Sequence, residues 1–309
     1  MKASRPRVLT QEDFDRFASI SRDDNPIHCD PAFASTTHFG ATVAHGMFLF
    51  SLLCAQMQRS TPRPVLPIAQ TLMFPRPTFV GDGVAAVLVL NETPGRDRIA
   101  LDTSIRCVQR GRNRTPATDE QITAQGDAVL LVDASAESLA EAQRQDADEF
   151  GHSAGHLVAQ PAGERTLYHL SVGQEASAIR SFSAGDIDEY VALTDDGSAL
   201  YTDPVFAHSR GFEGTIVPLP LLAGMFSDLL GTRLPGRGTG WMKQSLRLRS
   251  PARLGELLTA SVRIVRLRRD KDLVNLATVV TGDDGRVVLA GEALVLVRNL
   301  EDKRSLAAA

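Results

Sequence analysis

Internal repetition is the feature of this sequence that most constrains its fold. Residues 17–42 align without a gap with residues 190–215 at a constant offset of 173, so that Asp23 corresponds to Asp196. Such a long period is that of a whole domain, since solenoid and propeller repeats recur every ~20–50 residues. The chain is therefore expected to contain one type of domain twice.

Two further pairs of segments extend the repeat towards the end of each half. Residues 74–82 correspond to residues 248–256, where the offset has grown to 174, and residues 124–132 resemble residues 289–297. The chain of 309 residues is about twice as long as a typical domain. Two similar domains in tandem therefore account for its length.

A segment of different composition separates the two halves. Residues 133–166 are rich in Ala, Glu, Gln, Asp and Gly, and their apolar residues show no sustained strand period. We therefore predict a first domain over residues 1–132, a linker over 133–166 and a second domain over 167–309. Within the linker, Ala134–Asp148 contains good helix formers and can form a helix on the surface.

The same order of secondary structure is predicted in each half. A short capped helix, Gln11–Ser19 or Ala184–Leu193, is followed by a polar loop and then by a longer, almost wholly apolar helix, Val43–Gln58 or Leu219–Leu230. The remaining segments are predicted to be strands: Ala69–Phe74, Val84–Leu90, Arg98–Gln109, Gln121–Val132, 241–249, 257–268, 272–281 and 286–298. A buried helix wrapped by an antiparallel sheet is a hot-dog fold. We therefore predict an α+β chain with a double hot-dog fold, its two sheets paired edge to edge.

Charge and composition exclude several classes of function. The formal net charge is −4, so no basic field attracts a nucleic-acid backbone. Three scattered cysteines fit neither a disulfide framework nor a closed zinc site, which favours a reducing compartment. The N-terminus lacks the apolar core of a secretory signal, and no apolar run approaches the ~20 residues that span a bilayer. We expect a cytoplasmic protein that binds neither nucleic acid nor membrane.

One loop of the first half carries an acid and an imidazole five positions apart, Asp23 and His28. Pro26 fixes one backbone angle between them and restricts Asn25, so the loop is expected to be stiff. Such a loop can point both side chains at one water molecule. The water can then lose a proton to this pair while a proton is delivered to carbon, as hydration of an activated double bond requires.

The start of the long apolar helix provides a second element of the predicted site. The segment Ala44-His45-Gly46-Met47 begins this helix, where unpaired N–H groups and the positive end of the helix dipole converge. Gly46 lets a thioester carbonyl approach the backbone closely. His45 belongs either to the substrate-binding set or to the structure, where it would satisfy a backbone group.

These residues resemble the signature of the MaoC-like (R)-specific enoyl-CoA hydratases. The resemblance extends over Phe17-Ala18, Ser21 to Asp30, Phe33-Ala34, Phe39-Gly40 and Ala44 to Met47. It implies a hot-dog fold and a hydro-lyase that adds water reversibly and syn to a trans-2-enoyl thioester, giving the (R)-3-hydroxyacyl thioester. It also implies that Asp23 and His28 are the catalytic pair, that Asn25 organises the loop and that the Gly46 N–H binds the thioester oxygen. No cofactor and no metal are implied.

The sequence departs from this family pattern at several positions. Arg22 stands where the family usually has a small residue, so it either disturbs the loop or offers a cation to an acidic substrate group. In the second half Asp196 remains, but the position of the histidine is Tyr201 and the helix start reads 217–220, Val-Pro-Leu-Pro. The second half is therefore expected to support the active half without its own chemistry, and to help shape the acyl channel.

Three alternatives to an enoyl-CoA hydratase remain open from the sequence. The same residues can dehydrate a 3-hydroxyacyl or polyketide intermediate on a carrier protein. A hot-dog thioesterase would release free CoA, and a non-catalytic partner subunit would act through an active one. The substrate is expected to be an acyl-CoA or acyl-carrier-protein thioester. Its chain length, the direction of reaction and whether two copies form a homodimer are not fixed by the sequence.

Overall fold

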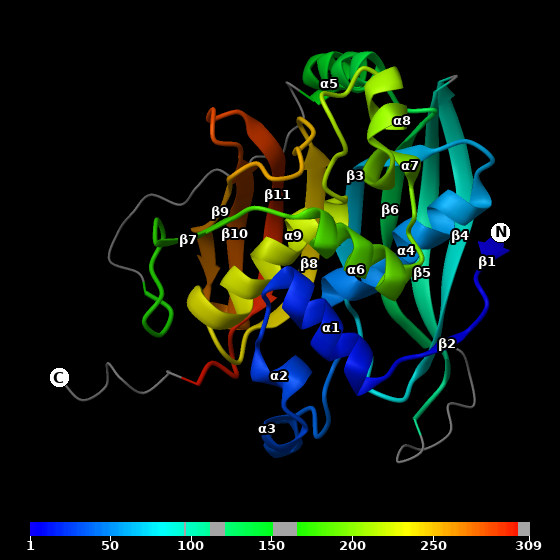
Figure 1. Cartoon of the computed structure of the whole chain (residues 1–309). Coiled ribbons are helices and arrows are strands. Elements are labelled where there is room, and N and C mark those ends of the chain that lie inside the picture. Colours follow the sequence, from blue (N-terminus) through cyan, green and yellow to red (C-terminus); the bar gives the residue numbers. More distant parts are fainter. Residues whose placement is uncertain (96, 112–120, 151–165, 302–309) are drawn as a thin grey trace.

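The structure of the chain is a computed structural model that describes residues 1–95, 97–111, 121–150 and 166–301 (Figure 1). The helices are α1 (Gln11–Ser21), α2 (Pro26–Cys29), α3 (Pro31–Thr36), α4 (Gly46–Ser60), α5 (Ala136–Phe150), α6 (Ala184–Thr194), α7 (Ala199–Thr202), α8 (Pro204–Ser209) and α9 (Leu219–Asp228). The strands are β1 (Lys2–Ala3), β2 (Arg7–Val8), β3 (Val65–Met73), β4 (Gly83–Gly95), β5 (Arg98–Gln109), β6 (Gln121–Val132), β7 (Glu175–Arg180), β8 (Gly240–Leu248), β9 (Leu258–Arg268), β10 (Leu273–Thr281) and β11 (Val287–Leu296).

Over the described residues, all eleven strands form one antiparallel sheet. Their order is β1-β4-β5-β6-β3-β8-β11-β10-β9-β7, with β2 paired to β4, so each half contributes the same series of strands in mirrored order. The halves meet where β3 pairs with β8, from Ala69 opposite Arg247 to Met73 opposite Lys243. Figure 1 shows α1, α4, α6 and α9 on one side of this sheet. The predicted edge-to-edge pairing of two sheets is therefore confirmed.

The short helices α1 and α6 form for the same local reason in both halves. Thr10 caps α1 in a reciprocal capping box with Asp13, and Ser183 caps α6 in the same way with Asp186. Both predicted helices are confirmed, and each is extended at its C-terminus. The polar loops that follow also contain single helical turns, because proline at the first helical position and Asx side chains stabilise helix starts.

The long helix α4 begins at Gly46 rather than at the predicted Val43. Val43 forms a β-bridge with Phe79, and the Ala44 N–H donates to the Thr78 carbonyl at 2.8 Å. These contacts hold the two residues in an extended conformation, which delays the start of the helix by three positions. The bare N-terminus of α4 is thereby placed beside the loop that holds Asp23.

Some strands differ from the prediction. β3 begins at Val65, four residues before the predicted Ala69, and β7 was not predicted. β7 is an edge strand whose burial alternates only between exposed and half-buried positions, so its sequence carries little apolar periodicity.

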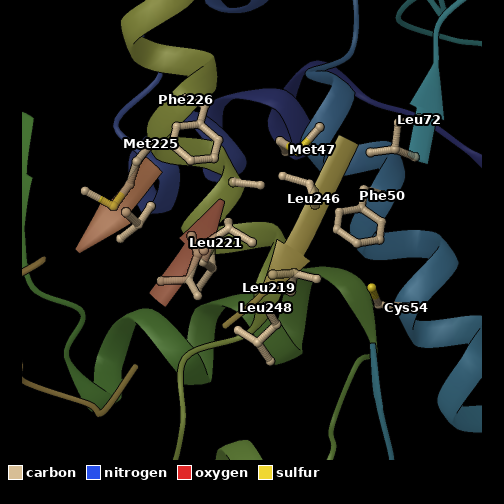
Figure 2. Packing of buried hydrophobic residues seen from close by; sticks show 14 of the residues in the cluster. Met47, Phe50, Cys54, Leu72, Leu219, Leu221, Met225, Phe226, Leu246 and Leu248 are labelled. Carbon is tan, nitrogen blue, oxygen red and sulfur yellow. The ribbon is translucent and has the colours of Figure 1, made fainter. Parts of the chain in front are cut away.

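The apolar side chains of both halves form one cluster in the described residues, not the two cores that the chain length suggests. α4 and α9 lie at its centre. Figure 2 shows side chains of α4, α9 and β8 gathered there, among them Phe50, Leu221 and Leu246. Each fully buried Leu or Phe contributes roughly 1.5–3 kcal/mol of transfer free energy. The shared core fixes how the two halves sit against one another.

The helix predicted at the start of the linker is present as α5, which packs against the body rather than only covering the surface. Leu139 and Ala142 are buried, and the Ala136 N–H donates to the Arg210 carbonyl at the end of α8 (Figure 1). The rest of the predicted linker, 151–165, and the C-terminal residues 302–309 lie outside the described residues, so the domain boundaries stay a prediction. No helix in the described part of the chain has both the length and the hydrophobicity needed to cross a bilayer.

Candidate active site

The loop after α1 is shaped by local hydrogen bonds. Arg22 ends the helix in the left-handed conformation, with φ of 63°, and turns the chain towards Asp23. The Ser21 hydroxyl donates to the Phe17 carbonyl at 2.7 Å and accepts from the Asp23 N–H at 3.3 Å. The Asp23 carboxylate in turn accepts the Asn25 N–H at 3.3 Å. Asp23 is thus a buried acid in a short, internally bonded turn.

Asn25 connects this loop to the second half of the chain. Its side-chain oxygen caps α2 by accepting the Ile27 N–H, and its amide nitrogen donates to the Gly231 carbonyl at 3.3 Å. Pro26 opens α2 at the first helical position, where its missing N–H costs no hydrogen bond. The single turn of α2 then brings His28 back towards Asp23.

The orientation of His28 is fixed by one backbone contact. Its Nδ1 lies 2.7 Å from the Val43 carbonyl oxygen, so Nδ1 carries the proton and donates. In the neutral ring, Nε2 then holds a lone pair, and it lies 3.8 Å from Oδ2 of Asp23. Both side chains are largely buried. The structure therefore brings the two predicted catalytic residues together.

The gap between Asp23 and His28 suits one water molecule. At 3.8 Å the carboxylate oxygen and the imidazole nitrogen are too far apart for a direct hydrogen bond, and both are acceptors. A water molecule can donate one hydrogen to each of them. The lone pairs of its oxygen then point away from Asp23 and His28, as attack on a substrate carbon requires.

Ser227 of α9 adds a residue that the sequence analysis missed. Its hydroxyl donates to Oδ2 of Asp23, across 204 positions of sequence. The offset of 173 pairs Ser227 with Cys54, which lies on α4 of the first half. The repeat could have indicated this residue, because Ser227 and Cys54 occupy the same position of the buried helix in the two halves. The carboxylate of the first half is thus held by a helix of the second.

Gly46 is the first residue of α4, and its N–H belongs to the group that has no partner within a helix. A Cβ at this position would lie 2.7 Å from Cζ of Phe74, so only glycine fits without a shift of the ring. The helix dipole adds partial positive charge here. The arrangement can bind a carbonyl oxygen, as predicted.

His45 supports the site from behind. It is fully buried, its Nε2 donates to the Asp23 carbonyl oxygen at 2.9 Å, and its ring stacks on His28 with centroids 3.8 Å apart. Burial, followed by the neighbouring imidazole of His28, lowers the pKa of His45 to about 3. A neutral His45 therefore orients the Asp23 backbone and the His28 ring. Its predicted part in substrate binding stays a prediction.

The carboxylate and the two imidazoles are also the described residues from which a metal ion could be bound at this site. One ligand atom from each of Asp23, His28 and His45 lies within 4.8 Å of the others. The hydrogen bonds to the Val43 and Asp23 carbonyls, however, give each ring a use as a neutral donor. The other nitrogen of each ring, Nε2 of His28 and Nδ1 of His45, keeps its lone pair.

A cavity of about 240 Å³ opens in front of these groups, lined by Asp23, His28 and Gly46 from the first half. Residues of the second half close its other side, including Ser227, Leu230 and Trp241. Arg76 and His38 also line it. The site is therefore built from both halves. The Asp23 and His28 pair and the start of α4 at Gly46 line the same cavity.

The aspartate and the tyrosine of the corresponding loop in the second half are both buried. Asp196 is fully buried, and one of its oxygens accepts the Tyr190 hydroxyl at 2.7 Å. Tyr201 occupies the place of His28 and is itself buried. α9 begins at Leu219, the counterpart of Gly46, so a leucine side chain stands where the first half leaves the backbone bare. The second loop keeps an acid but lacks the groups that would act with it.

Comparison with known proteins places the first half in a described family. A family model named "MaoC like domain" matches residues 1–106. Among solved structures, a MaoC-like dehydratase superposes with a TM-score of 0.70 at 16% identity, covering 95% of this chain and 96% of that one. A protein of Mycobacterium tuberculosis described as having a double hot-dog fold gives a TM-score of 0.66 at 15% identity, covering 96% of this chain and 95% of that one. These two likenesses confirm the predicted fold.

The relatives found by sequence comparison have a higher identity to this chain than those two structures, but they are shorter. The (R)-specific enoyl-CoA hydratase of Aeromonas caviae is 40% identical over 126 residues, which make up 41% of this chain and 94% of that protein. The matched stretch has about the length of one half of the repeat. This chain therefore belongs to the MaoC-like family of (R)-specific enoyl-CoA hydratases.

Proposed function

We propose that the chain is a hydro-lyase that adds water reversibly and syn to a trans-2-enoyl thioester, giving the (R)-3-hydroxyacyl thioester. One observation carries the proposal: two acceptors 3.8 Å apart, on Asp23 and His28, line the same cavity as the unpaired N–H of Gly46. Acyl thioester hydration needs a held water and a site for the oxygen that becomes an enolate. Groups suited to both tasks line this cavity.

The proton transfers balance within the pair. As the water oxygen bonds to C3, one water proton passes to His28 Nε2, and Asp23 stabilises the imidazolium that forms. The electron pair of the C2=C3 bond moves onto the thioester oxygen. The imidazolium then returns a proton to C2, which restores the double bond of the carbonyl and the neutral ring. Because one pair serves both carbons, the hydroxyl and the hydrogen arrive on one face.

The Gly46 N–H donates to the thioester oxygen while that oxygen carries negative charge. A preorganised donor of this kind accelerates a reaction by about 10²–10³-fold. Dehydration of a 3-hydroxyacyl thioester uses the same groups in reverse, by microscopic reversibility. The acyl carrier, CoA or a carrier protein, does not change the chemistry at C2 and C3.

The test is hydration of crotonyl-CoA, followed by loss of the enoyl absorbance. Asp23→Asn and His28→Ala are each expected to lower kcat at least ~100-fold, since each removes one partner of the acid–base pair. Asp24→Asn and His208→Ala are matched controls, because both change an exposed residue of the same type. They should retain full activity.

Two outcomes would reject the proposal. Equal rates for the wild type and both site variants would show that the pair is not catalytic. Release of free CoA from crotonyl-CoA, measured with a thiol reagent, would instead identify a thioesterase.

A further inference from the structure

The helix α9 ends differently from its counterpart α4. α4 is α-helical throughout, whereas α9 continues into a π-helical turn, η1 (Leu229–Arg233). Within it the Leu234 N–H donates to the Leu229 carbonyl five residues earlier, at 2.8 Å. Such a turn takes up one residue more than an α-helical turn, and π turns are frequent at functional sites. The extra residue agrees with the repeat, whose offset grows from 173 to 174 between Ser227 and Leu248.

One carbonyl of this turn faces the loop of the first half. An α-helical hydrogen bond to the Gly231 carbonyl would come from position 235, which is Pro235 and has no N–H. The next N–H along the chain, that of Gly236, donates to the Leu230 carbonyl at 3.2 Å. The Gly231 carbonyl accepts from the Asn25 side chain at 3.3 Å. The second half thus offers a backbone acceptor to the loop that carries Asp23 and His28.

Glycine is required at position 231 because the two segments approach closely. A Cβ on Gly231 would lie 2.7 Å from Nδ2 of Asn25 and 3.6 Å from its Cγ. Non-bonded atoms pack best at about 3.5–4.0 Å, so a methyl group would push the amide away. Only 3% of Asn25 is exposed, so its side chain has little room to move without its backbone.

Asn25 connects this contact to both reactive side chains. Its N–H donates to Oδ1 of Asp23 at 3.3 Å, and its carbonyl accepts the His28 N–H at 2.9 Å. Its side-chain oxygen accepts the Ile27 N–H at 3.4 Å and so caps α2, the turn that carries His28. A shift of Asn25 therefore changes the separation of 3.8 Å between Oδ2 of Asp23 and Nε2 of His28.

The described part of the second loop lacks the corresponding contact. Ser198 stands at the position of Asn25, its Oγ has no hydrogen-bond partner there, and it does not cap α7. Gln58 stands where the offset of 173 places Gly231, and its side chain bonds to the backbone of Val65. The π turn and its glycine therefore lie beside the loop that has the acid–base pair.

We propose that Gly231 is a positioning residue of the active site, and that the π turn presents its carbonyl to hold Asn25 in place. This inference rests on the proposed hydration. Gly231 acts through Asn25, by fixing the distance between the two acceptors that hold the attacking water. A misplacement of about 1 Å at a reacting group can cost about 100-fold in rate.

Gly231→Ala tests this role on crotonyl-CoA. It is expected to lower kcat about 10–100-fold with KM within about threefold, because the water-holding pair is displaced while the N–H of Gly46 is unchanged. Gly214→Ala is the matched control, since a Cβ added to this second-half glycine would meet no atom within 4 Å. It should keep kcat within about 1.5-fold of wild type.

A double-mutant cycle shows whether the effect passes through Asn25. Asn25→Ser introduces the residue that the second half has at this position, and it removes the amide that the methyl group of Gly231→Ala would meet. Asn25→Ser alone should lower kcat about tenfold or more, and adding Gly231→Ala should lower it by less than about twofold further. An effect of alanine on the helix or on the cavity would instead appear in full in both backgrounds.

Gly231 also lines the cavity, so substrate binding is measured separately. Trp241 is the one tryptophan of the sequence and lines the cavity, so its fluorescence reports binding of butyryl-CoA without turnover. Gly231→Ala should bind this saturated analogue within about threefold of wild type. Weaker binding with a raised KM and full kcat would mean that the methyl group meets the substrate, and the inference would be wrong.

The inference is also overturned if Gly231→Ala keeps full kcat, or if it lowers kcat equally in the wild type and in Asn25→Ser. Should Gly231→Ala fail to fold, Asn25→Asp tests the same hydrogen bond from its other end. Its carboxylate can still cap α2 but cannot donate to the Gly231 carbonyl, so kcat should fall about tenfold or more, and full activity would overturn the inference. A fully active Gly231→Ala beside an inactive Asp23→Asn would sink this inference alone. An active Asp23→Asn would sink the proposed function itself.

Discussion

The loops that follow α1 and α6 have nearly the same backbone and different chemistry. Each helix ends in a left-handed residue with φ of 63°, Arg22 or Asp195. Each then has an N–H that donates to a hydroxyl two residues earlier, at 3.3 Å for Asp23 and 3.2 Å for Asp196. The shared caps and turns hold both aspartates in the same place, so backbone geometry alone does not make a site.

The difference lies in what each aspartate faces. Asp23 faces an imidazole, a bare helix start and a cavity, whereas Asp196 faces the buried rings of Tyr190 and Tyr201. Burial raises the pKa of Asp196 to about 7, although the hydrogen bond from Tyr190 lowers it in part. A catalytic acid needs an acceptor and an opening as well as a position. The second loop has the backbone geometry of the first, but buried side chains enclose its aspartate.

The two halves also exchange support. Ser227 of the second half donates to Asp23, and Cys54, at the corresponding position of the first half, is the residue of α4 that lies near Asp196. A site confined to one half would lack the donor to its carboxylate. This crossing gives the second half a part in the site of the first.

The largest effect is expected when the hydrogen bond between the two halves, from Ser227 to Asp23, is removed. Ser227→Ala removes a hydrogen bond to a charged group, which contributes roughly 1.5–3 kcal/mol, so kcat for crotonyl-CoA is expected to fall about 10–100-fold. Cys54→Ala, at the matching position of the repeat, should change kcat less than twofold. Equal kcat values for both variants and the wild type would mean that the halves do not share the site.

A smaller effect concerns stability. Asp196 stays protonated in the folded protein up to a pH of about 7 but ionises near its ordinary pKa of 3.8 when unfolded. The stability that its neutral form provides is thus complete below pH ~4 and is lost as pH rises to about 7. Asp196→Asn cannot ionise, so its advantage over the wild type should grow with pH. Since each pKa unit corresponds to about 1.4 kcal/mol, a gain in Tm on the order of several degrees is expected at pH 8.

Thermal unfolding at pH 4 and pH 8 measures this gain. At pH 4 the variant and the wild type should melt within about two degrees of each other, because Asp196 is then neutral in the folded state and only partly ionised in the unfolded chain. Asp188→Asn is the control: it removes an exposed charge from the same half and should show no such pH dependence. The same difference in Tm between Asp196→Asn and the wild type at both pH values would contradict the raised pKa of Asp196.

Much of this comparison was visible in the sequence because it rests on local patterns. The strands Arg98–Gln109 and Gln121–Val132 were predicted with their observed bounds, since buried positions alternate along most of the first and the second ends in the apolar run 128–132. The offset of 173 predicted which residues of the two loops correspond. The catalytic assignment of Asp23 and His28 stays a prediction, but the structure does bring them together.

What the sequence could not provide depends on contacts between distant segments. The start of α4 was misplaced because segment 78–80, more than thirty residues away, holds Val43 and Ala44 extended. Ser227 went unnoticed because its partner is 204 positions distant. Local propensity carries no information on such pairings.

The smallest expected effect sharpens the comparison at the position of the missing histidine. Tyr201 lies where His28 lies in the first half, yet Pro218 stands at the position of His45 and Leu219 at that of Gly46. Tyr201→Phe removes only a hydroxyl from this buried cluster, so kcat and KM for crotonyl-CoA should both stay within about 1.5-fold of wild type. Tyr190→Phe removes the hydrogen bond to Asp196 and leaves a buried carboxyl oxygen of Asp196 without that donor. It should therefore lower Tm more than Tyr201→Phe does. A loss of kcat in Tyr201→Phe without a loss of Tm would reveal chemistry in the second loop and end the contrast between the halves.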